Sequence, residues 1–206
     1  MRILLDQASK KYKHDTIFRN LSLQLNKGDR LGISGPNGSG KSTLLKIISG
    51  QTSLTKGTRT YFSENGNAIE EELVFSHFSY AAPYIVLIEE FTLPEILKFY
   101  AGFRKSYVDS VDEMTQISGI AFKNRYIKDY SSGMKQRAKI LLALCFESEV
   151  VLLDEPSTNL DKEGVSWTKA LIETYLNERT LIIASNEAND FDLIHNQLDI
   201  RDYKNF

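Results

Sequence analysis

The chain has 206 residues, of which 42% are hydrophobic and 25% are charged, and its formal net charge is −2. This composition is typical of a globular domain with a sizeable core, and the interspersed charges exclude a strongly basic surface for nucleic acid. The single cysteine, Cys145, excludes an internal disulfide and a cysteine-built metal site. We therefore expect one domain in a reducing, cytoplasmic setting, without nucleic acid as a partner.

The first part of the chain predicts strands that lead into one helix. Residues 21–25 alternate between apolar and polar side chains, as a half-buried strand does. Residues 30–34 predict a short buried strand before a glycine-rich loop, and residues 41–49 predict a helix that stops at a glycine. Residues 57–80 predict strands around a turn at residues 64–67.

The second part is helical before strands return. From residue 93 to residue 127 the pattern is helical and aromatic, and Ser131 or Ser132 is placed to cap a helix that runs to about Phe146. The remaining predicted elements are a strand, a helix, a strand, a short helix and an edge strand, with the four longer segments at residues 150–153, 164–176, 180–184 and 197–200.

This order of elements predicts the fold class. Strands that alternate with helices indicate an α/β fold with a mainly parallel central sheet, here with an antiparallel β part. The helical segment, about residues 84–145, is interpreted as a lobe inserted between core segments 1–83 and 146–206 of a single domain. Within it Phe99, Tyr100, Phe103 and Tyr107 have helical spacing, which predicts that they pack inside the lobe.

The strongest motif lies between the strand 30–34 and the helix that follows it. It fits the phosphate-loop pattern G-x-x-x-x-G-K-[ST] and consists of Gly35, Pro36, Asn37, Gly38, Ser39, Gly40, Lys41, Ser42 and Thr43. Glycines let successive N–H groups point at one anion, and the helix N-terminus adds a positive dipole. The pattern places Lys41 on the β- and γ-phosphates and the Ser42 hydroxyl on Mg²⁺.

Two carboxylates end the apolar strand 150–153. Because ligands of open α/β sheets bind at the carboxyl ends of strands, Asp154 is expected beside the phosphate loop, where it holds Mg²⁺ directly or through water. Glu155 is expected to reach past the metal, align the attacking water and accept its proton. Alone, such a strand end is weak evidence, but together with the phosphate loop it is strong.

With both motifs placed, the chain resembles the nucleotide-binding domain of ABC transporters, which has a P-loop NTPase fold. Residues 130–137 read YSSGMKQR and are similar to the family signature, commonly L-S-G-G-Q followed by Q-R. Residues 156–161 read PSTNLD and resemble the family's D-loop. The signature residues are Ser131, Ser132 and Gly133, in an inserted helical lobe that the resemblance implies.

The resemblance implies a function and its partners. The cofactors would be ATP and Mg²⁺, and the reaction would be ATP hydrolysis. Two domains would associate head to tail, as a homodimer or a heterodimer, with each ATP held by one phosphate loop and the other chain's signature. The pair would act at the cytoplasmic face of a membrane through a separate spanning subunit, because no apolar run here approaches roughly 20 residues.

Three positions need separate comment under this resemblance. Tyr12 stands where an aromatic residue stacks on adenine, although a strand residue packed on the core remains the alternative. Asn186 replaces the family's histidine and cannot carry its charge, so we expect slower hydrolysis. The substitution Asn186→His should raise the ATPase rate. Ala82 or Pro83 stands where a glutamine is usual, which puts the metal shell and the coupling route in question.

Other interpretations of the sequence stay open. Residues 84–87 and Phe91 supply apolar groups either for a groove that holds a partner's helix or for the lobe's own core. The departures at Asn186 and Pro83 motivate a second hypothesis, a nucleotide-gated regulatory module with little turnover. A third hypothesis, a soluble relative acting on DNA or ribosomes, is disfavoured by the single phosphate loop and the absence of a basic surface.

Overall fold

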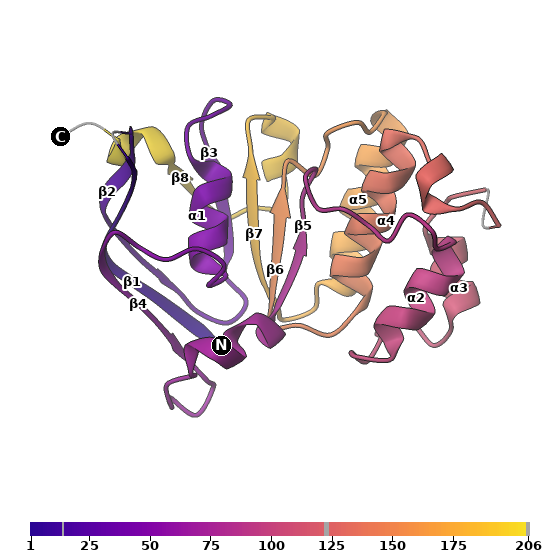
Figure 1. The fold of residues 1–206 in the computed structure, drawn as a ribbon, viewed down its shortest axis with the longest axis horizontal. Coiled ribbons are helices and arrows are strands. Elements are labelled where there is room, and N and C mark those ends of the chain that lie inside the picture. Colours follow the sequence, from indigo (N-terminus) through magenta and orange to yellow (C-terminus); the bar gives the residue numbers. More distant parts are fainter. Residues whose placement is uncertain (14, 122–123, 205–206) are drawn as a thin grey trace.

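The computed structural model describes residues 1–13, 15–121 and 124–204. Figure 1 shows two sheets side by side, with one helix against the middle of the molecule and a group of helices at the other end. The described strands are β1 (Arg2–Tyr12), β2 (Asp15–Leu25), β3 (Arg30–Ser34), β4 (Lys56–Phe62), β5 (Phe78–Ala81), β6 (Val150–Asp154), β7 (Thr180–Ser185) and β8 (Asn196–Asp199). The described α-helices are α1 (Lys41–Ile48), α2 (Leu93–Ala101), α3 (Val111–Ile117), α4 (Ser132–Cys145) and α5 (Lys162–Tyr175).

The larger sheet is parallel and positions the site. Its strand order is β5-β6-β7-β3-β8, and each neighbouring pair runs in the same direction. All residues of β6 and β7 are buried, which explains the apolar runs at residues 150–153 and 181–184 within them. Because the strands are parallel, their carboxyl ends meet at one edge, and the predicted mainly parallel sheet is confirmed.

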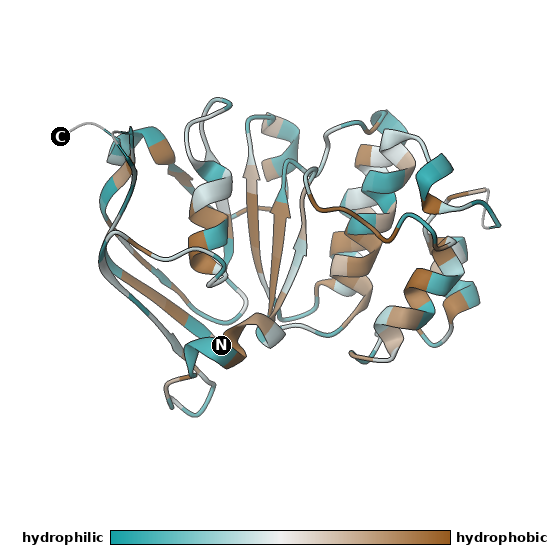
Figure 2. Ribbon diagram, in the orientation of Figure 1, coloured by the Kyte–Doolittle hydropathy of each residue, from teal (hydrophilic) through white to brown (hydrophobic). Residues whose placement is uncertain are grey.

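Alternate residues of the central strands face two different cores. Val151 and Leu153 pack with α4 and α5, whereas Val150 and Leu152 pack with α1 and the antiparallel sheet. Figure 2 shows β6 and β7 as hydrophobic along their lengths between these layers. The sheet therefore separates α1 from α4, and these two helices lie on opposite faces.

The smaller sheet is antiparallel, with strand order β2-β1-β4. The strand predicted at residues 21–25 is the end of β2, while β1 was not predicted. Its burial pattern is interrupted rather than alternating, and its pairing with β2 shifts register after Leu5, Ala8 and Lys10. Such bulges destroy the period of two that reveals a strand in sequence.

The prediction of strands throughout residues 57–80 was wrong in its middle. The turn is present, since the Ser63 amide donates to the Asn67 carbonyl at 2.8 Å. Between it and β5 there is an isolated bridge from Phe62 to Ala68 in place of a strand. A 3-10 helix then occupies Glu71–His77. Three further 3-10 turns lie at Ile127–Asp129, Ala188–Phe191 and Ile200–Tyr203.

The helices begin at polar caps. Ser131 accepts a hydrogen bond from the Met134 amide at 3.2 Å and caps α4, as predicted for one of the two serines. Asp161 caps α5 in the same way through the Gly164 amide, at 2.8 Å. Thr92 and Glu95 form a capping box that starts α2. Residues 93–127, predicted to be helical, contain α2 and α3.

The predicted aromatic cluster of the helical segment, Phe99, Tyr100, Phe103 and Tyr107, is not part of its buried core. Phe99 meets Phe91 and Phe103 edge to face, so the predicted packing within the lobe is partly present. Phe103 is nevertheless 75% exposed and Phe99 44% exposed, so the cluster is not buried. The core there is aliphatic and includes Leu93, Ile96 and Leu97. In the described part of the chain, no helix combines the length and apolarity needed to cross a membrane.

Candidate functional site

The phosphate loop joins β3 to α1 at the carboxyl edge of the parallel sheet. Residues 35–40 form the loop, and Lys41, Ser42 and Thr43 form the first turn of α1. Gly40 has φ 113°, and a Cβ there would lie 2.3 Å from Cγ2 of Ile17 on β2. Glycine is therefore required at this position by backbone conformation and by the close approach of the antiparallel sheet.

Lys41 is buried inside the loop with its ammonium satisfied. Its Nζ donates to the carbonyl oxygens of Gly35, at 2.8 Å, and Pro36, at 3.3 Å. The same ammonium lies 3.0 Å from Oε1 of Glu155. The structure thus brings together the predicted phosphate-binding lysine and the predicted water-activating carboxylate.

Asp154 is the last residue of β6, lies beside the first turn of α1 and is 1% exposed. Burial raises the pKa of its carboxyl, while the hydroxyls of Ser42 and Tyr84 act in the opposite direction. Oδ2 accepts a hydrogen bond from Tyr84, whereas buried Oδ1 has no hydrogen-bond partner. A buried carboxylate oxygen without a donor, near a serine hydroxyl, fits the oxygen ligands that Mg²⁺ prefers.

Glu155 is fixed by several groups at once. It has φ 47°, an uncommon conformation for a non-glycine residue. Its Oε2 accepts a hydrogen bond from the backbone N–H of Asn186 at 3.4 Å. The same oxygen lies 3.2 Å from the hydroxyl oxygen of Ser185. Asn186 thus lies directly after β7 beside Glu155, with an exposed side chain.

Sequence reasoning missed the polar residues behind Glu155. The hydroxyls of Ser185 and Ser157 donate to Oδ2 of Asp190 at 2.5 Å and 3.0 Å. Burial raises the pKa of Asp190, and these two hydroxyls oppose that effect. No motif marks Asp190, because the contact depends on how a 3-10 turn folds back after β7.

Sequence reasoning also missed Tyr84 as a polar residue of the site, since it was considered only as an apolar group. Its hydroxyl donates to Oδ2 of Asp154 at 3.0 Å and is hydrogen-bonded to the hydroxyl of Tyr80. Desolvation raises the pKa of both phenols, so both stay protonated donors near neutral pH. Tyr84, which follows the position of the family's glutamine, therefore makes a polar contact with the site through Asp154.

The signature residues lie on the other face of the sheet. Ser131 caps α4, and Ser132 and Gly133 form its first turn. A Cβ on Gly133 would lie 2.8 Å from the carbonyl oxygen of Asn159, so the signature packs closely on the D-loop. Gln136 reinforces that contact by donating to the carbonyl of Pro156 at 3.1 Å. Within one chain, the signature is not brought to the phosphate loop carried by α1.

Tyr12 is at the tip of the β1-β2 hairpin and pairs with Asp15. The ring is 47% exposed, and Nζ of Lys10 lies 4.6 Å from its centroid. Ile17 of the same hairpin contacts the loop at Gly40. The hairpin tip is thus near the phosphate loop, and the stacking of Tyr12 on adenine stays a prediction.

A cavity of about 220 Å³ lies between β5, α2 and α4. Its lining includes Ile85, Leu87, Tyr100 and Arg104. Of the apolar segment predicted as groove or core, Leu87 is buried but Val86 is 82% exposed. Leu87 is therefore part of the core, and the groove for a partner's helix stays a prediction.

Comparisons with known proteins agree with this site. The sequence profile of the ABC transporter family matches residues 18–158, which include the phosphate loop, the signature and the two carboxylates. The glutamate/aspartate import ATP-binding protein GltL of Escherichia coli (strain K12) is 28% identical over 195 residues, which cover 90% of this chain and 80% of that protein. ABC transporter A family member 7 of Dictyostelium discoideum is 27% identical over 186 residues, covering 88% of this chain but 22% of its own length.

A solved structure has the same fold. A bacterial ABC transporter cassette, determined as a dimer, superposes with a TM-score of 0.79 at 21% identity and covers 96% of this chain and 94% of its own. The predicted α/β P-loop NTPase fold is therefore confirmed. Since the family profile covers more than half of the chain and its motifs lie where the fold requires them, the protein belongs to the ABC transporter family, as a nucleotide-binding domain.

Proposed function

We propose that this domain binds ATP with Mg²⁺ and hydrolyses it to ADP and phosphate, and that ATP-driven dimerisation powers a separate membrane-spanning partner. One observation carries the proposal: the Lys41 ammonium lies 3.0 Å from the Glu155 carboxylate. This contact is at the sheet edge where β6 ends with Asp154. A phosphate-binding cation and a water-activating base are thus adjacent, as hydrolysis of a phosphoanhydride requires.

Each residue has a defined task in this reaction. The loop amides of residues 35–43 and the N-terminus of α1 hold the phosphates, and Lys41 stabilises their negative charge. Ser42 and Asp154 would hold Mg²⁺, which neutralises charge on the phosphate oxygens. Glu155 aligns the attacking water and accepts its proton. Asn186, exposed beside Glu155, would donate a hydrogen bond where a histidine is usual, and we expect slow hydrolysis for that reason.

The separation of the two phosphate-binding surfaces supports a head-to-tail dimer. Because α1 and α4 lie on opposite faces of the parallel sheet, a nucleotide on the phosphate loop cannot reach its own chain's signature. The exposed N-terminus of α4, with Ser131 and Ser132, is instead available to a second chain. Such a dimer would bury each ATP between two chains.

An exposed aromatic surface supports a membrane partner. Phe75 and Phe103 are 71% and 75% exposed, and Arg104 connects them because its Nη2 donates to the Phe75 carbonyl at 3.3 Å. Arg104 also lines the cavity between β5, α2 and α4. Large exposed aromatic groups beside a cavity are typical of a protein interface. We take this interface to be formed by the lobe of residues 84–145 together with the adjoining Phe75, at the cytoplasmic face of the membrane.

The alternative is a regulatory module that closes on ATP with little turnover, and one experiment separates the two. ATP turnover and oligomeric state of the purified chain are measured with Mg²⁺ for wild type and Glu155→Gln. Glu173→Gln, at an exposed position of α5, is the matched control. We expect turnover to fall by at least about 100-fold in Glu155→Gln only, because general-base catalysis is lost, while an ATP-bound dimer accumulates.

The other outcomes have clear meanings. If Glu155→Gln hydrolyses ATP as fast as wild type, the role given to Glu155 is wrong. If wild type binds ATP without turnover, the regulatory alternative is supported. If wild type binds no ATP at all, both hypotheses fail.

A further inference from the structure

Tyr84 lies in the segment that leads from β5 towards α2 and reaches back into the site. Its hydroxyl donates to Oδ2 of Asp154 at 3.0 Å. A hydroxyl has one proton, so the hydrogen bond between the two phenols must be donated by Tyr80 to the oxygen of Tyr84. Tyr80, Tyr84 and Asp154 therefore form a directed chain of hydrogen bonds that ends on the carboxylate.

The ring of Tyr84 is held independently of its hydroxyl. Nζ of Lys46, in the last turn of α1, lies 4.2 Å from the ring centroid. The ring of Tyr80, on β5, meets it edge to face at 6.3 Å and 84°. Groups from α1 and β5 thus fix a tyrosine whose hydroxyl is aimed at the end of β6.

The contact divides the two oxygens of Asp154 between two tasks. Oδ2 is occupied by Tyr84, while Oδ1 is buried without a hydrogen bond. A donor on one oxygen restrains rotation of the carboxylate and leaves the other oxygen for a cation. We propose that Tyr84 is a positioning residue for Asp154, which orients this carboxylate to receive the divalent cation that accompanies ATP.

This inference rests on the proposed function, in which Asp154 holds Mg²⁺, and it assigns a new residue to that site. Hydrogen bonds from groups behind a metal ligand commonly contribute tenfold or more to metal affinity. The hydroxyl of Tyr84 is such a group, in a segment whose sequence contains no glutamine.

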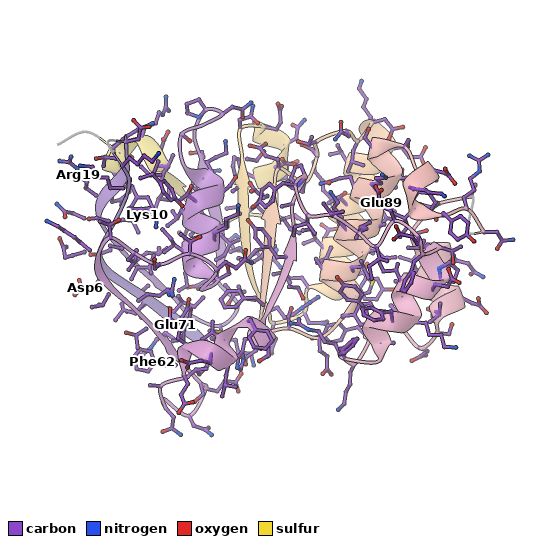
Figure 3. All side chains as sticks on the ribbon, in the orientation of Figure 1. Asp6, Lys10, Arg19, Phe62, Glu71 and Glu89 are labelled. Atoms are coloured by element: carbon purple, nitrogen blue, oxygen red, sulfur yellow. The ribbon has the colours of Figure 1, made fainter. Side chains whose placement is uncertain are left out.

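The segment that carries Tyr84 is also tied to the signature helix. Nζ of Lys139 on α4 donates to the carbonyls of Ala82, at 3.2 Å, and Pro83, at 2.7 Å. Glu89, seen beside α4 in Figure 3, forms an ion pair with Lys135 at 2.8 Å. Both ends of residues 82–89 are thus attached to α4, so the Tyr84 hydroxyl connects the metal-binding carboxylate to the helix that presents the signature.

The test compares Tyr84→Phe with wild type by binding of a fluorescent ATP analogue. The affinity for the analogue is first measured without Mg²⁺, in EDTA. Mg²⁺ is then titrated, and the concentration at which Mg²⁺ has produced half of its full increase in affinity is determined. We expect unchanged affinity in EDTA and a requirement for about tenfold more Mg²⁺ in Tyr84→Phe. Tyr80→Phe leaves the bond to Asp154 in place and should give a smaller shift in the same direction.

Tyr126→Phe is the control, because Tyr126 is similarly exposed, at 49% against 45% for Tyr84, and precedes α4. It should not change the Mg²⁺ requirement. An unshifted or lower Mg²⁺ requirement in Tyr84→Phe, or an equal loss of affinity with and without Mg²⁺, would overturn the inference. A wild-type chain that binds no ATP would contradict the proposed function as well, which distinguishes the two failures.

Discussion

At the scale of single residues, the site is built from polar groups that have few free hydrogen-bonding positions. Lys41 is shared between two loop carbonyls and Glu155. Glu155 in turn accepts from the backbone N–H of Asn186 and lies beside the Ser185 hydroxyl. Oδ1 of Asp154 is buried and has no hydrogen-bond partner. Buried groups are normally satisfied, so this oxygen marks the place where a ligand completes the site.

The same network makes a prediction for Asp190. Burial raises its folded-state pKa above the ordinary value of 3.8. A raised carboxyl pKa means that its contribution to stability is present below that ordinary value and is lost as pH rises through the folded-state pKa. Asp190→Asn has no such titration. We expect the free energy of unfolding of wild type, relative to the variant, to fall as pH is raised from acid to neutral.

Urea unfolding of both proteins at a series of pH values measures this difference. The expected decline should be confined to the interval between the ordinary and the raised pKa. A stability difference that stays constant, or grows with pH, would show that Asp190 is not held in a desolvated environment.

At the scale of elements, α4 connects the signature to the rest of the site. Its N-terminus presents Ser131, Gln136 holds the segment after Glu155, and Lys139 holds the segment before Tyr84. The last part of the helix is buried against β5 and β6 and contains Cys145. One helix therefore presents the signature and holds two separate segments of the chain.

Lys139 makes this arrangement testable. Lys139 is 9% exposed, and its ammonium donates to two carbonyls. Desolvation lowers the pKa of this ammonium. Lys139→Met keeps the length of the side chain and removes both hydrogen bonds. We expect the free energy of unfolding to fall by about 1–3 kcal/mol, since hydrogen bonds to charged groups contribute that much.

Chemical denaturation measures the change, and Lys98→Met on α2 is the matched control because Lys98 is exposed. That control should alter stability by no more than about 0.5 kcal/mol. Equal effects of the two substitutions would mean that the contacts of Lys139 with residues 82 and 83 contribute nothing specific.

At the scale of the whole molecule, the parallel sheet separates the two surfaces that contact nucleotide in the proposed dimer. The phosphate loop belongs to the core that contains α1, and the signature belongs to the core that contains α4. Figure 1 shows these helices on different sides of β5 and β6. A second chain is the simplest way to bring a signature to each phosphate loop.

Ser131→Trp tests that arrangement in the Glu155→Gln background. The indole would block the approach of a second chain at the N-terminus of α4, so ATP-driven dimerisation should be lost while monomer affinity for ATP is unchanged. Light scattering and nucleotide binding measure the two properties. Ser166→Trp, on the exposed face of α5, should leave the dimer intact. A dimer that survives Ser131→Trp would contradict the head-to-tail arrangement.

The sequence by itself determined the fold class, the family and the phosphate loop. These depend on local patterns: apolar strands such as residues 150–153, the glycines before Lys41, and the cap at Ser131. It did not reveal β1, whose bulges interrupt its alternation, or the exposure of Phe99 and Phe103, because helical spacing does not say which face meets solvent.

Only the tertiary structure decided which distant side chains meet. Tyr84 is 70 residues from Asp154, and Asp190 is 33 residues from Ser157, yet each pair is hydrogen-bonded. Neither contact has a motif, because it depends on where parallel strands end and how the following turns fold back. The same sheet separates the signature from the phosphate loop, since its two faces belong to different cores. Motifs such as the phosphate loop consist of neighbouring residues and can be recognised in the sequence, whereas these contacts follow from the packing of the whole chain.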